Sequence, residues 1–232
     1  MANLDEDLKL KILANEPIPL DDIFIYPISI KQIAKFGYKQ YNQGLKILCI
    51  SKQEIKDLIG EEISPFEFLR VNMIFEPSIE KILSKLLSLI CKNKVIFSDE
   101  KQAFIVGKGL FDKNNFDKFV DIVREQNCII AGNIDEKPFN EKAKLILEKR
   151  RKARNKLMKN SHAEENLSIY DLVNIVSVGM NLSINEVMEY SIYQLSSQFQ
   201  RLMAKENYYI NILALIHGAS KSNIDLKHWI QD

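Results

Sequence analysis

Residues 167–202 read LSIYDLVNIVSVGMNLSINEVMEYSIYQLSSQFQRL, and this stretch predicts helices that follow one another with short turns between them. Ser168-x-x-Asp171 and Ser183-x-x-Glu186 have the form of capping boxes. In a capping box the serine oxygen accepts an early backbone N–H, and the acid three residues later reaches back to the serine. Residues 179–182, Gly-Met-Asn-Leu, form the predicted turn between the two helices. We therefore expect residues 167–232 to form a helical C-terminal domain of three helices.

The same capping pattern recurs toward the N-terminus, and there it is joined by a strand signal. Apolar residues recur at helical spacing in residues 30–45, 79–90 and 116–126. Residues 94–97 and 102–106 are two apolar runs around a four-residue turn, which is typical of a β-hairpin. Further helix starts are predicted at Ser29-x-x-Gln32, Ser51-x-x-Glu54 and Ser64-Pro65-x-Glu67. The predicted fold class is mainly α with a small β-hairpin near 94–106, in an α+β N-terminal domain of residues 1–140.

A strongly basic stretch lies between these two predicted domains. The chain carries a net charge of +1, yet residues 141–160 contain nine Lys or Arg and only two Glu, a local charge of +7. Ile146, Ala153 and Leu157 give this stretch a thin apolar stripe, so it is expected to be one exposed basic helix. Residues 141–166 are therefore assigned to a basic helix followed by a polar linker.

Composition sets the broad class of the protein. Its 232 residues are 46% apolar, enough for one large or two small packed domains. Residues 1–7 lack the basic and apolar regions of a secretory signal, and no apolar run approaches a membrane span. We therefore expect a cytoplasmic protein with no membrane contact. Three cysteines are expected to be reduced core thiols, namely Cys49, Cys91 and Cys128.

No catalytic or metal-binding motif is present in the sequence. Gly107-Lys108-Gly109 lacks the longer frame with which a P-loop cradles phosphates. The three histidines are not paired at metal-ligand spacing, and no G-x-S-x-G nucleophile turn occurs. The sequence therefore predicts no enzyme activity and no cofactor.

Two features leave nucleic-acid binding open as an alternative. The basic cluster could be a solvated face, a site for an acidic protein or a phosphate contact. It has no interleaved aromatic residues, which argues against base stacking. Residues 170–195 also have the outline of a helix-turn-helix, but Glu186 and Glu189 near its second helix would repel phosphates. The basic cluster consists of Lys149, Arg150, Arg151, Lys152 and Arg154.

The order of residues in the C-terminal part resembles the tail assembly chaperones of long-tailed bacteriophages. The matching text is Ile184 to Leu195, then Phe199-Gln-Arg-Leu202, Tyr208 to Leu215, Gly218-Ala219 and Leu226-Lys-His-Trp229. Tyr26-Pro27, Tyr41-Asn42 and the segment 64–69 resemble the N-terminal region of such proteins from phages or prophages of low-GC Gram-positive hosts.

The resemblance implies a non-enzymatic binding protein that acts in virion morphogenesis. Its expected partners are the tape measure protein and the major tail tube protein, with a homo-oligomer possible. Large apolar residues exceed what a three-helix unit needs to bury, so a surplus could form a groove for partner helices, although all of them could be core. A structural tail or baseplate component and a helix-turn-helix DNA-binding protein are the alternatives. Besides the basic cluster, the predicted partner-binding residues are Tyr193, Phe199, Tyr208, Tyr209 and Trp229. Leu202 is counted with them among the apolar residues that could line the groove.

Overall fold

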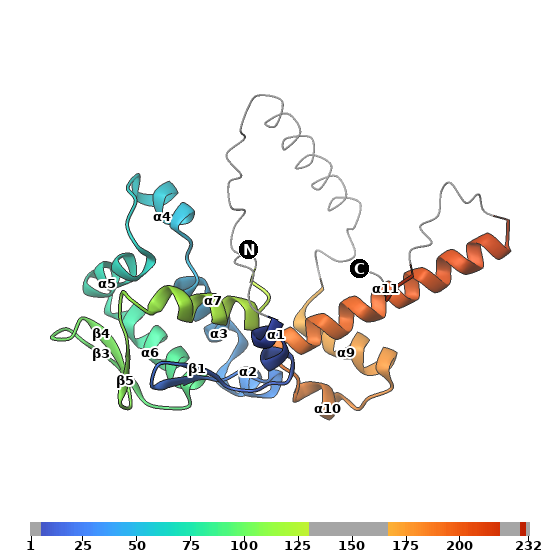
Figure 1. Cartoon of the computed structure of the whole chain (residues 1–232), viewed down its shortest axis with the longest axis horizontal. Coiled ribbons are helices and arrows are strands. Elements are labelled where there is room, and N and C mark those ends of the chain that lie inside the picture. The colour runs from blue at the N-terminus through green and yellow to red at the C-terminus, as the bar shows by residue number, and fades with distance from the viewer. Residues whose placement is uncertain (1–5, 130–166, 219–227, 231–232) are drawn as a thin grey trace, which may run out of the picture. The chain divides into compact units, whose positions relative to one another are not determined.

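The computed structural model describes residues 6–129, 167–218 and 228–230 (Figure 1). Contacts divide the chain into two units. Unit 1 comprises Met1–Gly132 together with Met188–Gln194, and unit 2 comprises Asn133–Val187 and Leu195–Asp232. The predicted class, mainly α with a small β part, is confirmed. The predicted basic helix of residues 141–160 lies outside the described residues.

Unit 1 is built around helix α6 (Pro77–Cys91), which contacts α3, α5 and three strands. Its buried residues Leu83, Leu86, Leu87, Ile90 and Cys91 follow the three- and four-residue spacing of one helix face. The other helices of the unit are α1 (Glu6–Leu13), α2 (Ile30–Phe36), α3 (Tyr38–Leu48), α4 (Lys52–Ile59), α5 (Pro65–Phe75) and α7 (Phe116–Gln126).

Helix α3 approaches α6 closely because Gly44 lies in the contact. A Cβ added at Gly44 would come within 2.9 Å of the Leu86 side chain, which is too close for a real contact. The helix therefore needs a residue without a side chain here, despite the cost of glycine in a helix interior. The result is a tightly packed helix pair at the centre of the unit.

The predicted hairpin is confirmed and extended by a third strand. β3 (Val95–Ser98) pairs antiparallel with β4 (Ala103–Val106), and β4 pairs with β5 (Gly109–Phe111). Gly107 has a positive φ and turns the chain from β4 toward β5, as expected for a turn residue. A second, two-stranded sheet of β1 (Ile18–Leu20) and β2 (Ile23–Ile25) was not predicted, because three-residue strands carry too little alternation to be recognised.

Phenylalanine rings fill the space between α5, α7 and the three-stranded sheet. The Phe111 ring stacks on Phe119 with centroids 4.2 Å apart, and Phe66 meets Phe116 at 5.0 Å. Phe104 is also fully buried and contacts Phe97 across the hairpin at 5.1 Å. Large rings of this kind bury much apolar area, so this cluster contributes strongly to the stability of unit 1.

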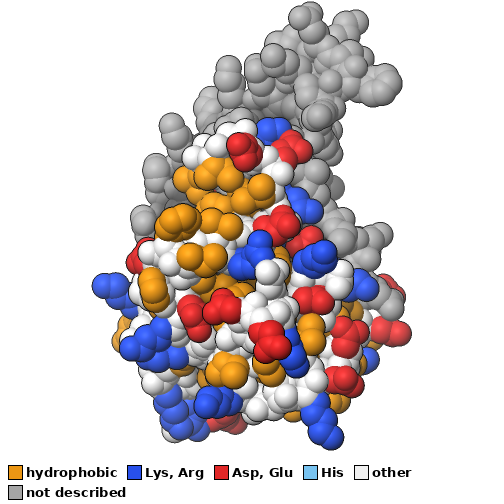
Figure 2. Space-filling view, turned by 90° about the vertical axis from the view of Figure 1, so that its left-hand side faces the viewer, with side chains coloured by type: hydrophobic (Ala, Val, Ile, Leu, Met, Phe, Trp, Pro, Cys, Tyr) orange, Lys and Arg blue, Asp and Glu red, His pale blue; other side chains and the backbone are white. Residues whose placement is uncertain are grey.

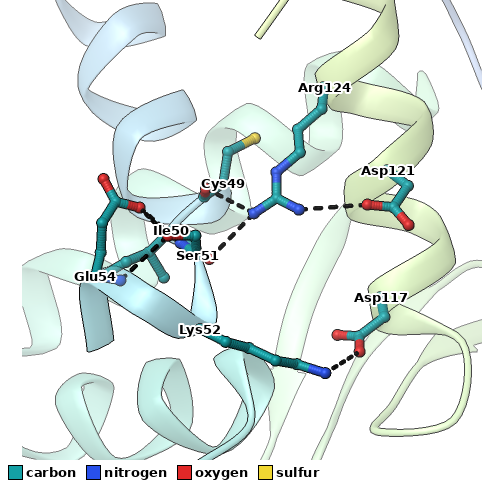
Figure 3. A network of polar contacts seen from close by, with 8 residues as sticks. All are labelled: Cys49, Ile50, Ser51, Lys52, Glu54, Asp117, Asp121 and Arg124. Carbon is teal, nitrogen blue, oxygen red and sulfur yellow. Dashed lines mark hydrogen bonds and ion pairs between the residues drawn. The ribbon is translucent and has the colours of Figure 1, made fainter. Parts of the chain in front are cut away.

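Arg124 fastens α7 to the junction between α3 and α4 (Figure 3). Its guanidinium donates to the backbone oxygens of Cys49 (2.9 Å) and Ile50 (3.2 Å) and contacts Asp121 on its own helix. The two carbonyls follow the end of α3, where a helix leaves its last oxygens without intrahelical partners. Lys52 and Asp117 form a second, exposed ion pair between the same elements.

The segment Met188–Gln194 is part of unit 1 although it lies far along the chain. The backbone N–H of Ile30 donates to the Tyr190 oxygen at 2.9 Å, and Ser29 forms an isolated antiparallel bridge with Ser191. Lys31 forms an ion pair with Glu189. Backbone bonding of this kind positions the segment at the start of α2.

Side chains complete the attachment of this segment. Gln194 Nε2 donates to the Leu13 oxygen and its Oε1 accepts from Asn15, both at 2.7 Å. Ile192 and Tyr193 pack against the hydrophobic core of unit 1. Unit 1 is therefore completed by residues that follow its α7 by about sixty positions.

The described part of unit 2 contains α9 (Ile169–Met180), α10 (Ile184–Met188) and α11 (Ile192–Ile216). Met188 at the end of α10 and Ile192–Gln194 at the start of α11 belong to unit 1. Among the described residues of unit 2, the buried apolar side chains are Val173, Val176, Val187, Leu195 and Leu202. Gly179 of α9 lies against Leu202 of α11, and an added Cβ would come within 2.3 Å of that side chain. Glycine therefore permits these two helices to pack closely.

The capping boxes at Ser29, Ser51 and Ser168 are confirmed, and Ser183 and Ser64 cap as predicted. The position of the second C-terminal break is different. The helix-turn-helix outline of residues 170–195 implied one helix from the turn at 179–182 to residue 195, but α10 ends at Met188 and a 25-residue helix begins at Ile192. The intervening backbone is held by its hydrogen bond to Ile30 in unit 1, so it does not continue the helix.

Candidate protein-binding surface

Helix α11 carries an apolar seam that is buried over its first half and exposed over its second. Leu195, Leu202, Tyr209 and Ile216 recur every seven residues and so lie on one face of the helix. Their exposed fractions are 1%, 8%, 50% and 72%. The covered half packs in unit 2, and the exposed half continues the same face without cover.

The lengths of the two helices explain this change. α9 has 12 residues and α11 has 25, so at 1.5 Å per residue they extend about 18 and about 37 Å. The contact between Gly179 and Leu202 places the end of α9 against the middle of α11. α11 continues well past α9 (Figure 1). We call its exposed apolar residues the distal face of α11, formed by Tyr209, Ile210, Leu213 and Ile216.

An aromatic cluster lies beside the distal face. The Tyr208 ring meets Tyr209 at 6.0 Å and His228 at 4.9 Å, and His228 stacks on Trp229 at 5.8 Å. Arg201 donates to the Trp229 backbone oxygen at 3.3 Å. Three predicted partner-binding residues are thus brought together: Tyr208 and Tyr209 lie on α11, and Trp229 lies beside it in the C-terminal segment.

The other predicted partner-binding residues lie elsewhere. Tyr193 packs against the core of unit 1, and burial raises the pKa of its phenol. Phe199 is half-buried on α11, and Leu202 is core. The five basic residues of 149–154 lie outside the described residues.

The helix-turn-helix outline differs from the arrangement that the structure describes. The second helix of that outline is α10, which has only five residues. Glu189, which was expected on that helix, instead pairs with Lys31 of unit 1. Glu186 caps the start of α10 through Ser183, whose hydrogen bonds lower the pKa of this carboxyl. The side chains expected to face DNA therefore have structural partners.

The cysteines are not arranged as nucleophiles. Burial raises the pKa of the Cys49 and Cys91 thiols to about 12, so both are protonated at neutral pH. The prediction that all three cysteines are core residues was wrong for Cys128, which is exposed. Cys128 follows α7 with a positive φ of 54°, and this turn directs it away from the core.

The remaining functions to consider for the described residues are metal binding, membrane insertion and binding in a cavity. Within 6–129, 167–218 and 228–230, no group of three or more His, Cys, Asp or Glu side chains could hold a metal ion. No helix in these ranges is both long and apolar enough to cross a bilayer. A depression of about 660 Å³ lies along α6 in unit 1, but Lys81, Lys85 and Glu80 line it beside Phe36 and Ile96 without converging on a point.

Comparison with known proteins finds a likeness in the C-terminal part. Residues 159–232 match the model of a family described as the YomV second domain. This match covers less than half of the chain and suggests a phage-related protein. No curated protein and no solved structure matches the chain. The matched segment contains the distal face of α11 and the aromatic cluster.

Sequence reasoning selected Tyr209 but missed its neighbours on the same face, Leu213 and Ile216. Tyr209 was selected because it is aromatic, whereas Leu213 and Ile216 are aliphatic and are identified only by their helical spacing from Leu202. The seven-residue spacing from Leu195 to Ile216 was the signal that would have identified them.

Proposed function

We propose that the protein is a tail assembly chaperone of a long-tailed bacteriophage and holds a helical segment of the tape measure protein on the distal face of α11. The observation that carries this proposal is the seam that is covered from Leu195 to Leu202 and uncovered from Tyr209 to Ile216. A partner helix with the same spacing would continue the packing that α9 begins. The likeness of residues 159–232 to a phage-related family supports the same setting.

The chemistry of the distal face specifies what the partner segment must be. Residues 207–218, NYYINILALIHG, contain no Asp, Glu, Lys or Arg. Binding at this face therefore depends on apolar burial, with each covered side chain contributing roughly 1–2 kcal/mol. A complex formed through the distal face should accordingly tolerate high salt.

The basic cluster of residues 149–154 is proposed as a second contact of the same complex. Its five cations would engage acidic faces of a coiled-coil tape measure protein. This contact would respond to salt, whereas the one on α11 would not. The two contributions can therefore be separated by measuring binding over a range of ionic strength.

The test is affinity capture of the co-expressed tape measure protein by the full chain. The double variant Leu213→Ser, Ile216→Ser should lose the complex, since it removes two exposed contacts and nothing from the core. Tyr170→Ser is the matched control, because Tyr170 is as exposed as Ile216 but lies on α9. Equal capture by the double variant and the wild-type chain would disprove binding at α11.

A second measurement distinguishes a chaperone from a permanent tail component. A chaperone leaves the tail before completion, so mass spectrometry of purified particles should not detect this chain. Its presence at a fixed ratio to the tail tube protein would indicate a structural tail or baseplate role. Reversal of Lys149, Arg150, Arg151 and Lys152 to Glu should weaken capture at low salt, and unchanged capture would remove the basic cluster from the interface.

A further inference from the structure

Unit 1 has its own exposed apolar surface on α4 and α5, two helices that contact each other. Phe75 is 83% exposed and Ile74 71% exposed. Hydrophobic side chains gather on the face of the molecule that carries these helices (Figure 2). We call this surface the α4–α5 patch, formed by Leu58, Ile59, Val71, Ile74 and Phe75.

Helix α5 is apolar on more of its circumference than its neighbours cover. Phe66, Leu69 and Met73 are spaced three and four residues apart and face the core. Val71, Ile74 and Phe75 point elsewhere and remain exposed. On α4, Ile55 is buried, while Leu58 and Ile59, one turn further on, are exposed. A helix that is apolar on more than one face is normally covered on each of them, which indicates a missing partner.

The charges between residues 52 and 76 are mainly acidic, and most of these carboxylates form no ion pair within the described residues. Four of them, Glu54, Asp57, Glu67 and Glu76, accept hydrogen bonds from neutral side chains of neighbouring residues. Three basic residues accompany six carboxylates between residues 52 and 76, and only Glu62 among those carboxylates forms an ion pair in the described structure, with Lys56. Lys52 forms an ion pair with Asp117 of α7, and Arg70 donates a hydrogen bond to the side chain of Gln102. The carboxylates are Glu54, Asp57, Glu61, Glu62, Glu67 and Glu76.

We propose that the α4–α5 patch docks a basic amphipathic helix of a partner protein, with the apolar stripe of that helix on Leu58, Ile74 and Phe75 and its cations beside the carboxylates that form no ion pair among the described residues. Apolar contact supplies the affinity, and the charge complement selects a basic helix over an acidic one. This surface is in unit 1, is opposite in charge to the basic cluster and does not depend on the function proposed for α11. Either assignment can fail while the other stands.

The experiment uses the full chain and a designed probe, a labelled leucine–lysine amphipathic peptide of about 18 residues, or about five helical turns. A matched peptide has glutamate at every lysine position. Fluorescence anisotropy should detect binding of the lysine peptide, and its Kd should rise on the order of tenfold when salt increases from about 0.05 M to about 0.5 M. The glutamate peptide should bind at least about tenfold more weakly because it faces carboxylates that no cation in the described part of the chain neutralises.

Variants locate the site. Ile74→Ser with Phe75→Ser should raise the Kd of the lysine peptide on the order of tenfold, since exposed anchors are removed while the core is untouched. Ile96→Ser is the control, because Ile96 is also exposed in unit 1 but lies on β3. Circular dichroism confirms that both variants remain folded.

Four outcomes would overturn the proposal. Equal binding of both peptides would remove the charge argument, and unchanged binding by the Ile74/Phe75 variant would place the peptide elsewhere. A dimer of the wild-type chain that the same variant dissociates would make a second copy the occupant. Tighter peptide binding after Lys149, Arg150, Arg151 and Lys152 are changed to Glu would make the chain's own basic segment the occupant.

Discussion

Unit 1 and unit 2 use their large apolar side chains differently. Unit 1 buries Phe104, Phe111, Phe116 and Phe119 completely in one continuous core. In unit 2 the seam of α11 is buried at Leu202, and at Tyr209 and beyond it is exposed. Folding therefore buries these rings of unit 1 completely, whereas in unit 2 it buries only about half of the α11 seam. The exposed half is the surface on which the proposed binding depends.

The largest expected effect is in the aromatic core of unit 1. Phe119→Ala should lower the free energy of unfolding by about 3–5 kcal/mol, because it removes a fully buried ring stacked on Phe111. Ile216→Ala, an exposed position of α11, should change it by less than about 0.5 kcal/mol. Urea denaturation followed by circular dichroism measures both, and similar losses would contradict the contrast between the units.

The boundary within α11 can be tested at Leu202. Leu202→Ala should destabilise unit 2 by about 2–4 kcal/mol, since the side chain fills the contact with Gly179. Leu213→Ala should leave the stability nearly unchanged, because Leu213 lies on the distal face. Hydrogen exchange of the α9 amides reports the difference. Unchanged protection after Leu202→Ala would show that α9 does not depend on this contact.

A smaller effect is expected at Arg124. Arg124→Met preserves much of the side-chain volume but removes the hydrogen bonds to the Cys49 and Ile50 oxygens. Loss of charge-assisted bonds from a mostly buried guanidinium should destabilise unit 1 by about 2 kcal/mol. Lys52→Met, which removes only the exposed pair with Asp117, is the control and should cost less than about 1 kcal/mol. Chemical denaturation of the two variants ranks them.

The smallest effect concerns the cap of α4. Ser51→Ala should cost about 1 kcal/mol, because the Ser51 oxygen accepts the Glu54 N–H at the start of the helix.

The same cap gives a pH dependence with a definite sign. Hydrogen bonds from the Ser51 hydroxyl and N–H lower the pKa of Glu54. A carboxyl with a lowered pKa stabilises the fold above its unfolded value, about 4.3, and loses that contribution as pH falls through its folded value. The stability difference between the wild-type chain and Glu54→Gln should thus be present at neutral pH and shrink below about pH 4. A difference that grows on acidification would contradict this assignment.

Local signals allowed much of the fold to be predicted from the sequence. The capping boxes at Ser29, Ser51 and Ser168 and the hairpin near 94–106 depend on residues within a few positions of one another. The attachment of Met188–Gln194 to unit 1 joins residues more than 150 positions apart, and no local pattern encodes it.

For the candidate site, too, some features could be predicted from local sequence and others depend on long-range packing. Tyr208, Tyr209 and Trp229 are brought together by ring contacts that include His228. Tyr193 is diverted to the core of unit 1 by the attachment of its segment. The period of α11 could have added Leu213 and Ile216, but the short length of α9, which leaves them uncovered, is a property of the packed structure.

Because Met188–Gln194 lies late in the chain, unit 1 cannot be completed until well after its N-terminal part has been synthesised. When residue 132 has been translated, unit 1 still lacks the backbone partner of Ile30 and the side chains of Ile192 and Tyr193. At 5–20 residues per second, those residues follow about 3 to 12 seconds later. Throughout that interval the nascent N-terminal unit presents an open edge, which closes only when the first turn of α11 has been made.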